Sequence, residues 1–230
     1  APWDPSPNGW IGDIVVRGEH VYVGGHFSQV GGKARNLISV LDAATGEATD
    51  WSANAEPPNP YYFSPGVWAL ALSGDTLYVG GHFASMGGQD RANLASLDAS
   101  TGLATTWNPT PDGDVNVLAI SNCHVYVGGS FYSIAGQARN GMAALDMATG
   151  LATTWNPGIA SRPEEYTDGP YLLQAFAFRG DTVFVGGAYF VIGGQGREGL
   201  AAVDANTGAV LDWNPNPAGG SPYAYVNALS

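Results

Sequence analysis

Acidic side chains lie in two of the three long connectors of this chain, and these are its first candidates for chemistry. The connectors run over residues 52–66, 158–172 and 214–225. Their relevant carboxylates are Glu56, Glu164, Glu165 and Asp168. A carboxylate pair can hydrolyse a glycoside, and carboxylate oxygens also suit Ca²⁺. Acidic residues in polar loops are more often only solvated, so we predict no catalytic residue and no cofactor, with calcium left open.

Aromatic residues share the same connectors with several prolines. A rigid ring in a stiffened loop loses little conformational entropy on binding, so such rings suit stacking on a sugar or contact with a protein. The alternative is that they fold back and cover the repeats. We predict ligand or partner binding by Tyr61, Tyr62, Phe63, Tyr166, Tyr171, Tyr223 and Tyr225.

Patterns typical of a nucleophile, a phosphate loop or a histidine metal site do not occur in the sequence. Cys123 is the single cysteine, which excludes an internal disulfide framework and a multi-thiolate metal site. We expect its thiol to be buried or half-buried, as is usual for a free cysteine. His26 and His82 occupy equivalent places but have no histidine counterparts elsewhere, so we interpret them as ordinary strand residues.

The net charge of the chain disfavours anionic binding partners. Eight Lys and Arg face 20 Asp and Glu, for a formal net charge of −12. Phosphate backbones and anionic lipids repel such a chain, so we expect neither nucleic-acid binding nor membrane insertion. The surface is poor in charge and rich in Thr, Ser, Asn and Gly, which is typical of exported bacterial β proteins. We therefore expect a secreted, extracellular or cell-surface location.

One apolar phrase followed by two glycines occurs four times, at residues 21–25, 77–81, 125–129 and 183–187. A fixed period of this size marks a repeat architecture, in which each unit buries its apolar face against its neighbours. We predict one repeat domain over residues 1–230. Its complete units are approximately 10–51, 67–107, 115–155 and 173–213, and its partial units are 1–9 and 226–230.

The second unit shows the strands expected in each repeat. Alternating apolar residues predict strands over 67–72 and 77–83, a loop at 87–91, a third strand over 93–97, and a turn then a fourth strand over 98–107. No helical periodicity competes with this pattern. Four-stranded meanders that recur usually pack radially, so the predicted fold is an all-β propeller of four-stranded antiparallel blades. A β-solenoid is the alternative.

Three residue types recur in equivalent places, and we predict structural roles for all of them. Aspartates that cap turns by accepting from backbone N–H groups are Asp42, Asp98, Asp146 and Asp204. Tryptophans that pack between neighbouring blades are Trp51, Trp107, Trp155 and Trp213. Arginines that fork onto a carboxylate or loop carbonyls are Arg35, Arg91, Arg139 and Arg197.

The partial units matter for assembly. Residues 3–5 match 107–109, the end of a unit, whereas 226–230 match 115–119, the start of one. The two ends either close a ring by sharing a blade or belong to a longer array. Unpaired terminal strands also invite pairing with another copy, so we predict self-assembly through them.

The repeated motifs V-Y-V-G-G-x-F, G-G-x-x-R, L-D-x-x-T-G and W-N-P resemble a β-propeller repeat family of unknown function from exported bacterial proteins. The resemblance covers essentially the whole chain and implies an extracellular repeat module. The Asp-x-x-Thr-Gly turn before Trp is also similar to the tryptophan-docking motif of quinoprotein dehydrogenases. There Trp follows Gly by four positions, whereas it follows by five here, as from Gly102 to Trp107. We therefore expect no quinone cofactor.

Taken together, the residues favour a non-catalytic extracellular scaffold or protein-interaction propeller, in a longer surface protein or an assembled fibre. The second hypothesis is a carbohydrate-binding propeller that uses the aromatic connectors. A polysaccharide hydrolase or lyase is less favoured, because no catalytic signature accompanies the acids. The expected partner is thus a protein or a polysaccharide.

Overall fold

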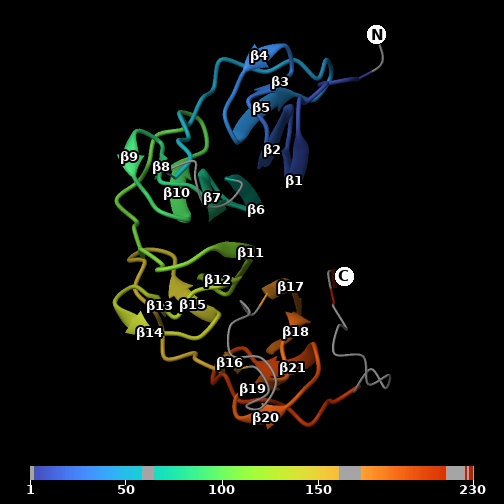
Figure 1. Cartoon of the computed structure of the whole chain (residues 1–230), viewed down its shortest axis with the longest axis vertical. Coiled ribbons are helices and arrows are strands. Elements are labelled where there is room, and N and C mark those ends of the chain that lie inside the picture. The colour runs from blue at the N-terminus through green and yellow to red at the C-terminus, as the bar shows by residue number, and fades with distance from the viewer. Residues whose placement is uncertain (1–2, 59–64, 161–171, 216–225, 227, 230) are drawn as a thin grey trace. The chain divides into compact units, whose positions relative to one another are not determined.

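The structure is a computed structural model that describes residues 3–58, 65–160, 172–215, 226, 228 and 229. Every regular element in these residues is a β-strand, which confirms the all-β prediction (Figure 1). The chain groups into two compact units, Ala1–Thr110 (unit 1) and Pro111–Ser230 (unit 2). Each unit contains two of the four expected repeats. In the described part of the chain no helix is long and apolar enough to cross a membrane.

Repeat 1 shows the architecture of every repeat. Strands β1 (Trp10–Arg17), β2 (His20–His26) and β5 (Ile38–Asp42) form an antiparallel sheet in the order β1-β2-β5. A two-residue hairpin of β3 (Gln29–Val30) and β4 (Lys33–Ala34) separates the second and third strands of this sheet. The segments expected to be glycine-rich loops are thus short hairpins, whose turns are formed by the glycines.

The other repeats follow the same plan. Repeat 2 consists of β6 (Gly66–Ser73), β7 (Thr76–His82), β8 (Ser85–Met86), β9 (Gln89–Asp90) and β10 (Leu94–Asp98). Repeat 3 consists of β11 (Val115–Ser121), β12 (His124–Gly129), β13 (Ser133–Ile134), β14 (Gln137–Ala138) and β15 (Met142–Asp146). Repeat 4 consists of β17 (Leu172–Arg179), β18 (Thr182–Ala188), β19 (Val191–Ile192), β20 (Gln195–Gly196) and β21 (Leu200–Asp204), and β16 (Ile159–Ala160) pairs with β19.

The fourth strand of each blade is shorter than expected. In repeat 1 it is a single bridge between Leu41 and Ala48, and the other repeats have the same isolated bridge. One residue further on, the carbonyl of Thr49 accepts a hydrogen bond from the Arg35 guanidinium at 2.8 Å rather than from a strand amide. Each blade is therefore a three-stranded sheet with a one-residue fourth strand.

The paired glycines mark where sheets approach one another. A Cβ on Gly24 would lie 2.3 Å from Cγ1 of Val67 in the next repeat. A Cβ on Gly25 would lie 2.2 Å from the carbonyl oxygen of Trp10 on the adjacent strand. Opposite these glycines the first strand carries a β-bulge, as between Ile11 and Asp13, and the bulge recurs in all four repeats. Glycine is needed here for close approach rather than for positive φ.

The core of each unit lies between its two repeats. In unit 1 one cluster combines Tyr22 and Val40 of repeat 1 with Leu70 and Val79 of repeat 2. In unit 2 the corresponding cluster joins repeats 3 and 4. Because each sheet is apolar on both faces, a single repeat cannot bury its side chains alone.

Connecting segments dock onto the repeat that follows them. The amide of Gly87 donates to the carbonyl of Ala53, and the amide of Gly193 donates to that of Pro157. The amide of Gly31 donates in the same way to Pro5, so the segment before repeat 1 docks like the segments before repeats 2 and 4. Repeats 1, 2 and 4 thus share one mode of attachment.

Cys123 corrects an expectation, because its side chain is exposed. Asn122 and Cys123 both have positive φ, 48° and 63°, in the tight turn between β11 and β12. A turn with two left-handed residues places their side chains outside the sheet. Turn geometry, rather than the apolar character of the thiol, decides its exposure.

Candidate functional site

A recurring tryptophan and a recurring tyrosine hold repeats 3 and 4 together. In unit 2 the ring of Trp155 meets that of Tyr126 edge-on, with centroids 5.1 Å apart. The Trp155 indole donates to the carbonyl of Asp204 at 3.0 Å, and the Tyr126 hydroxyl donates to that of Ala205 at 3.0 Å. Both aromatic residues belong to repeat 3 and both carbonyls belong to a turn of repeat 4. The pair therefore clamps one repeat to the next.

The other repeated tryptophans lie in the same place on their own repeats. Each contacts the aromatic residue of the second strand, in the pairs Tyr22–Trp51, Tyr78–Trp107 and Phe184–Trp213. Their exposure differs, since Trp107 is 4% exposed and Trp213 is 44% exposed. The contribution of these residues to stability should therefore differ as well.

The repeated aspartates cap turns through their carboxylates. Asp98 accepts from the hydroxyl of Ser100 at 2.6 Å and from the amide and hydroxyl of Thr101 at 2.8 and 2.9 Å. The Ser100 hydroxyl is the largest cause that lowers the pKa of Asp98, which falls to about 2. The pKa values of Asp42, Asp146 and Asp204 are lowered by bonds from their own turn residues, foremost Thr45, Thr149 and Thr207. These carboxylates are engaged in turn structure.

The repeated arginines fork onto main-chain carbonyls of their own repeat. Arg139 donates to the carbonyl of Ala138 at 2.8 Å and to that of Thr153 at 2.6 Å. The equivalent acceptors are Ala34 and Thr49 for Arg35, Asp90 and Thr105 for Arg91, and Gly196 and Leu211 for Arg197. The guanidinium joins the short hairpin to the end of the repeat.

The aromatic connectors, by contrast, lie outside the described residues, so the predicted partner-binding role stays a prediction. This applies to Tyr61, Tyr62, Phe63, Tyr166, Tyr171, Tyr223 and Tyr225, and also to Glu164, Glu165 and Asp168. Glu56 is described, and its amide donates to the carbonyl of Ser85 at 3.1 Å. Among the described residues no group of three or more His, Cys, Asp or Glu side chains is arranged to hold a metal ion.

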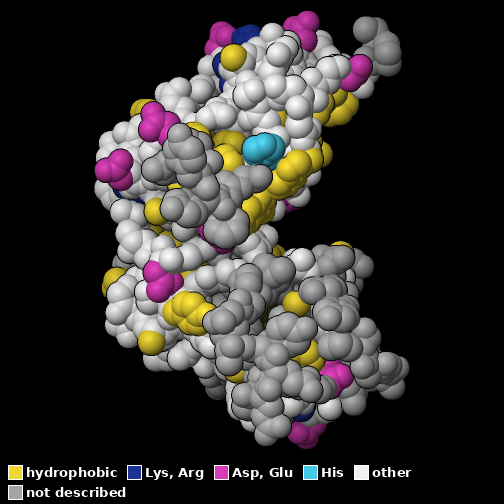
Figure 2. All heavy atoms as spheres, in the orientation of Figure 1, with side chains coloured by type: hydrophobic (Ala, Val, Ile, Leu, Met, Phe, Trp, Pro, Cys, Tyr) yellow, Lys and Arg dark blue, Asp and Glu magenta, His cyan; other side chains and the backbone are white. Residues whose placement is uncertain are grey.

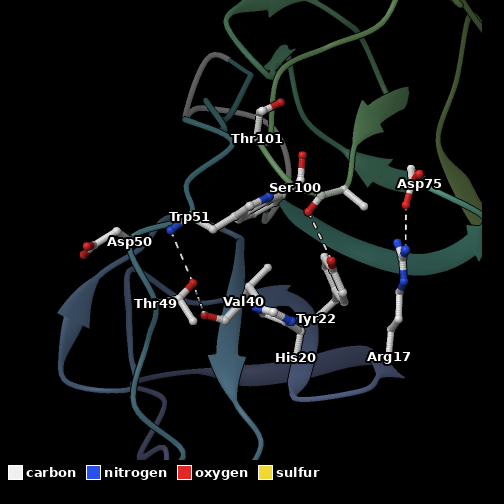
Figure 3. Close-up of a pocket in the computed structure, with 11 residues that line it drawn as sticks. Arg17, His20, Tyr22, Val40, Thr49, Asp50, Trp51, Asp75, Ser100 and Thr101 are labelled. Atoms are coloured by element: carbon white, nitrogen blue, oxygen red, sulfur yellow. Dashed lines mark hydrogen bonds and ion pairs between the residues drawn. The ribbon is translucent and has the colours of Figure 1, made fainter.

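A pocket that the sequence did not indicate lies between repeats 1 and 2 of unit 1 (Figure 3). Its volume is about 610 Å³, and we call it the Trp51 pocket. Its lining includes Arg17, His20, Tyr22, Asp50, Trp51 and Asp75. Figure 3 shows Trp51 near Tyr22 and His20, with Arg17 and Asp75 on the side of Tyr22 that faces away from Trp51.

The charged wall of the Trp51 pocket is an ion pair between the repeats. Arg17 ends β1 and contacts the carboxylate of Asp75 in the β6–β7 turn, while it also donates to the carbonyl of Gly74 at 2.8 Å. The hydrogen bond to Asp75 raises the pKa of Arg17, so the guanidinium stays charged. Tyr22 donates its hydroxyl to the carbonyl of Ala99, and burial raises its pKa. The pocket thus has a charged side and an aromatic side.

With the geometry in place, a family can be assigned. A family model described as outer membrane protein assembly factor BamB matches residues 34–156, which is more than half of the sequence. The chain belongs to this family. Membership in the BamB family confirms the expected propeller-type repeat. The finer resemblance, to an exported repeat of unknown function, stays a prediction.

Solved structures add similarity of fold to the BamB-family assignment. The extracellular domain of BT4673 from B. thetaiotaomicron, named as a one component system, is 16% identical with a TM-score of 0.50. The match covers 87% of this chain and 22% of that protein. The computationally designed proteins Ika4 and Ika8 are both 15% identical, with TM-scores of 0.47 and 0.40; the matches cover 86% and 90% of this chain and 92% and 75% of those proteins. No curated protein matches the chain.

Proposed function

We propose that this protein is a non-catalytic extracellular scaffold whose first strand binds a β-sheet of another protein chain. One observation carries the proposal. On β1 the side chains of Trp10, Ile14 and Val16 are 47%, 50% and 64% exposed. Exposed apolar side chains that lie together on one strand are typical of interaction surfaces. Figure 2 shows hydrophobic side chains gathered beside a histidine on unit 1.

The other repeats indicate what this strand binds. Leu70 of repeat 2 occupies the position of Ile14, is 5% exposed, and packs in the cluster shared with repeat 1. Phe176 of repeat 4 occupies the same position and lies 6.4 Å from Tyr126 of repeat 3, centroid to centroid. Strand positions that bury a neighbouring repeat elsewhere are therefore exposed on β1. A sheet face of the same repeat type fits them best, and a second copy of the chain is the simplest source.

Further observations support a non-catalytic function and an extracellular location. Among the described residues, the repeated aspartates cap turns, the repeated arginines bond main-chain carbonyls, and Trp155 bonds the next repeat. These contacts favour a structural role over catalysis. BamB-family membership points to protein contact as the use of the fold. An extracellular location agrees with the composition, and the acidic charge disfavours nucleic acid as partner.

Light scattering on purified protein over a range of concentrations tests the proposal. We expect particles heavier than the 23.8 kDa chain, and we expect Ile14→Ser combined with Val16→Thr to return them to that mass. Leu103→Ser combined with Leu151→Ser is the control, because these residues are 60% and 63% exposed but lie outside the strands. A wild-type protein that stays monomeric at every concentration would contradict the proposal.

A further inference from the structure

The joint between repeats 1 and 2, where the Trp51 pocket lies, differs in its side chains from the joint between repeats 3 and 4. Phe178 in repeat 4 packs on Tyr126 with ring centroids 4.8 Å apart. The equivalent residue in repeat 2 is the smaller Leu72, which packs against the cluster that contains Tyr22. At this position, beside the ring of Tyr22, unit 1 therefore carries the smaller side chain.

The charged side of the pocket also differs from the corresponding place in unit 2. Arg17 ends the first strand of repeat 1, and the matching residue of repeat 3 is Ser121. Repeats 3 and 4 therefore pack together without a guanidinium at this place. The Arg17–Asp75 pair is 45% and 82% exposed at its two side chains, and exposed pairs contribute little to stability. The fold does not require the pair.

The recurring tryptophan is more exposed at the joint between repeats 1 and 2 than at the joint between repeats 3 and 4. Trp155 is 2% exposed and its indole nitrogen donates to the next repeat. Trp51 is half-buried and lines the pocket, and its indole nitrogen has no hydrogen-bond partner among the described residues. Part of an aromatic ring therefore faces the hollow.

Size and charge define what the hollow can hold. Its volume of about 610 Å³ lies within the range of about 300–1,000 Å³ that is typical of small-molecule sites. The charged residues of the lining are Arg17, Asp50 and Asp75. Asp75 pairs with Arg17 and Asp50 pairs with Lys33 at 2.6 Å, so the lining offers hydrogen-bond donors and acceptors without an unpaired charge. The net charge of −12 on the chain disfavours an anion. The ligand should be uncharged and carry both donors and acceptors.

We propose that the Trp51 pocket binds an uncharged carbohydrate. The C–H face of a sugar ring stacks on the indole of Trp51, whose π-face is negative. Sugar hydroxyls then donate to Asp75 and accept from Arg17, across the pocket shown in Figure 3. The pocket lining includes none of Trp10, Ile14 and Val16, so failure of this proposal and failure of the scaffold proposal are distinguishable.

A glycan array of uncharged mono- and oligosaccharides, followed by titration calorimetry on the best ligand, tests the site. Leu72→Phe and Arg17→Ser each introduce the residue that unit 2 already accommodates. We expect each variant to lower the affinity at least about tenfold without lowering the melting temperature. Should Leu72→Phe fail to fold, Arg17→Ser decides alone, because its side chain lies on the surface.

Arg179→Ser is the matched control, since Arg179 is exposed and ends the first strand of repeat 4 in unit 2. It removes the same charge at the equivalent strand position and should leave the affinity unchanged. Three results would overturn the proposal. They are no binding to any uncharged sugar, equal affinity in the wild type and both pocket variants, or tighter binding of uronic acids than of the matching neutral sugars.

Discussion

Replacing Trp155 by alanine should destabilise unit 2 more than any equivalent change at Trp213. A large aromatic side chain buries about 150–250 Å², which at about 25 cal/mol/Å² corresponds to about 4–6 kcal/mol. Trp155 is 2% exposed and also loses a hydrogen bond to Asp204, so we expect a loss of about 4–5 kcal/mol in the free energy of unfolding. Trp213 is 44% exposed, and roughly half the area predicts about 2 kcal/mol.

Urea unfolding followed by far-UV circular dichroism measures both variants. With a slope of about 2–3 kcal/mol/M, the midpoint should fall by about 2 M for Trp155→Ala and by about 1 M for Trp213→Ala. Hydrogen exchange resolved by peptide should assign the loss to unit 2. The reasoning is refuted if the two variants lose the same stability, or if Trp155→Ala loses less than about 1 kcal/mol. Trp155→Phe keeps a ring and should recover most of the loss.

Three further outcomes are expected. Asp98→Ala should lower the melting temperature at pH 7. Because folding lowers the pKa of Asp98 from 3.8 to about 2, the stabilisation by its carboxylate is complete above pH 3.8 and is lost as the pH falls through about 2. The difference in melting temperature from the wild type should close over this range, and a difference that is unchanged at pH 2 contradicts the reasoning. Gly74→Ala should cost about 1–2 kcal/mol of unfolding free energy for its positive φ alone, because nothing lies within 4 Å of the added Cβ. Gly87→Ala should cost clearly more, because its Cβ would lie 2.3 Å from the Ala104 amide nitrogen. Equal losses in urea unfolding count against this steric clash. Arg139→Lys should cost about 1–2 kcal/mol, since a point charge cannot bond both carbonyls of the fork, and an unchanged unfolding midpoint speaks against that role.

Local chemistry explains why much of the fold is predictable. An aspartate three positions before a threonine caps its turn with any neighbours, so the role of Asp98 is legible from the sequence. The short apolar run around Tyr22, bounded by a turn, likewise predicts a strand that is buried on both faces. The one-residue fourth strand was not predictable in this way. Next to it the Arg35 guanidinium bonds the carbonyl of Thr49, a contact that only the folded hairpin creates.

The Trp51 pocket, too, could not be predicted from the sequence alone. Arg17 differs from Ser121 in the aligned repeats, so a signal existed in the sequence. Its meaning depends on Asp75, which belongs to the next repeat and meets Arg17 only when two sheets face each other.

By itself the sequence determined the strand order, the turns and the repeat, because hydrogen bonds and alternation within a few residues specify them. Tertiary structure decided which surfaces are left open. Leu70 and Ile14 are equivalent in sequence, yet one is 5% and the other 50% exposed. Burial depends on what packs against a strand, and that is a property of the neighbouring sheet rather than of the strand itself.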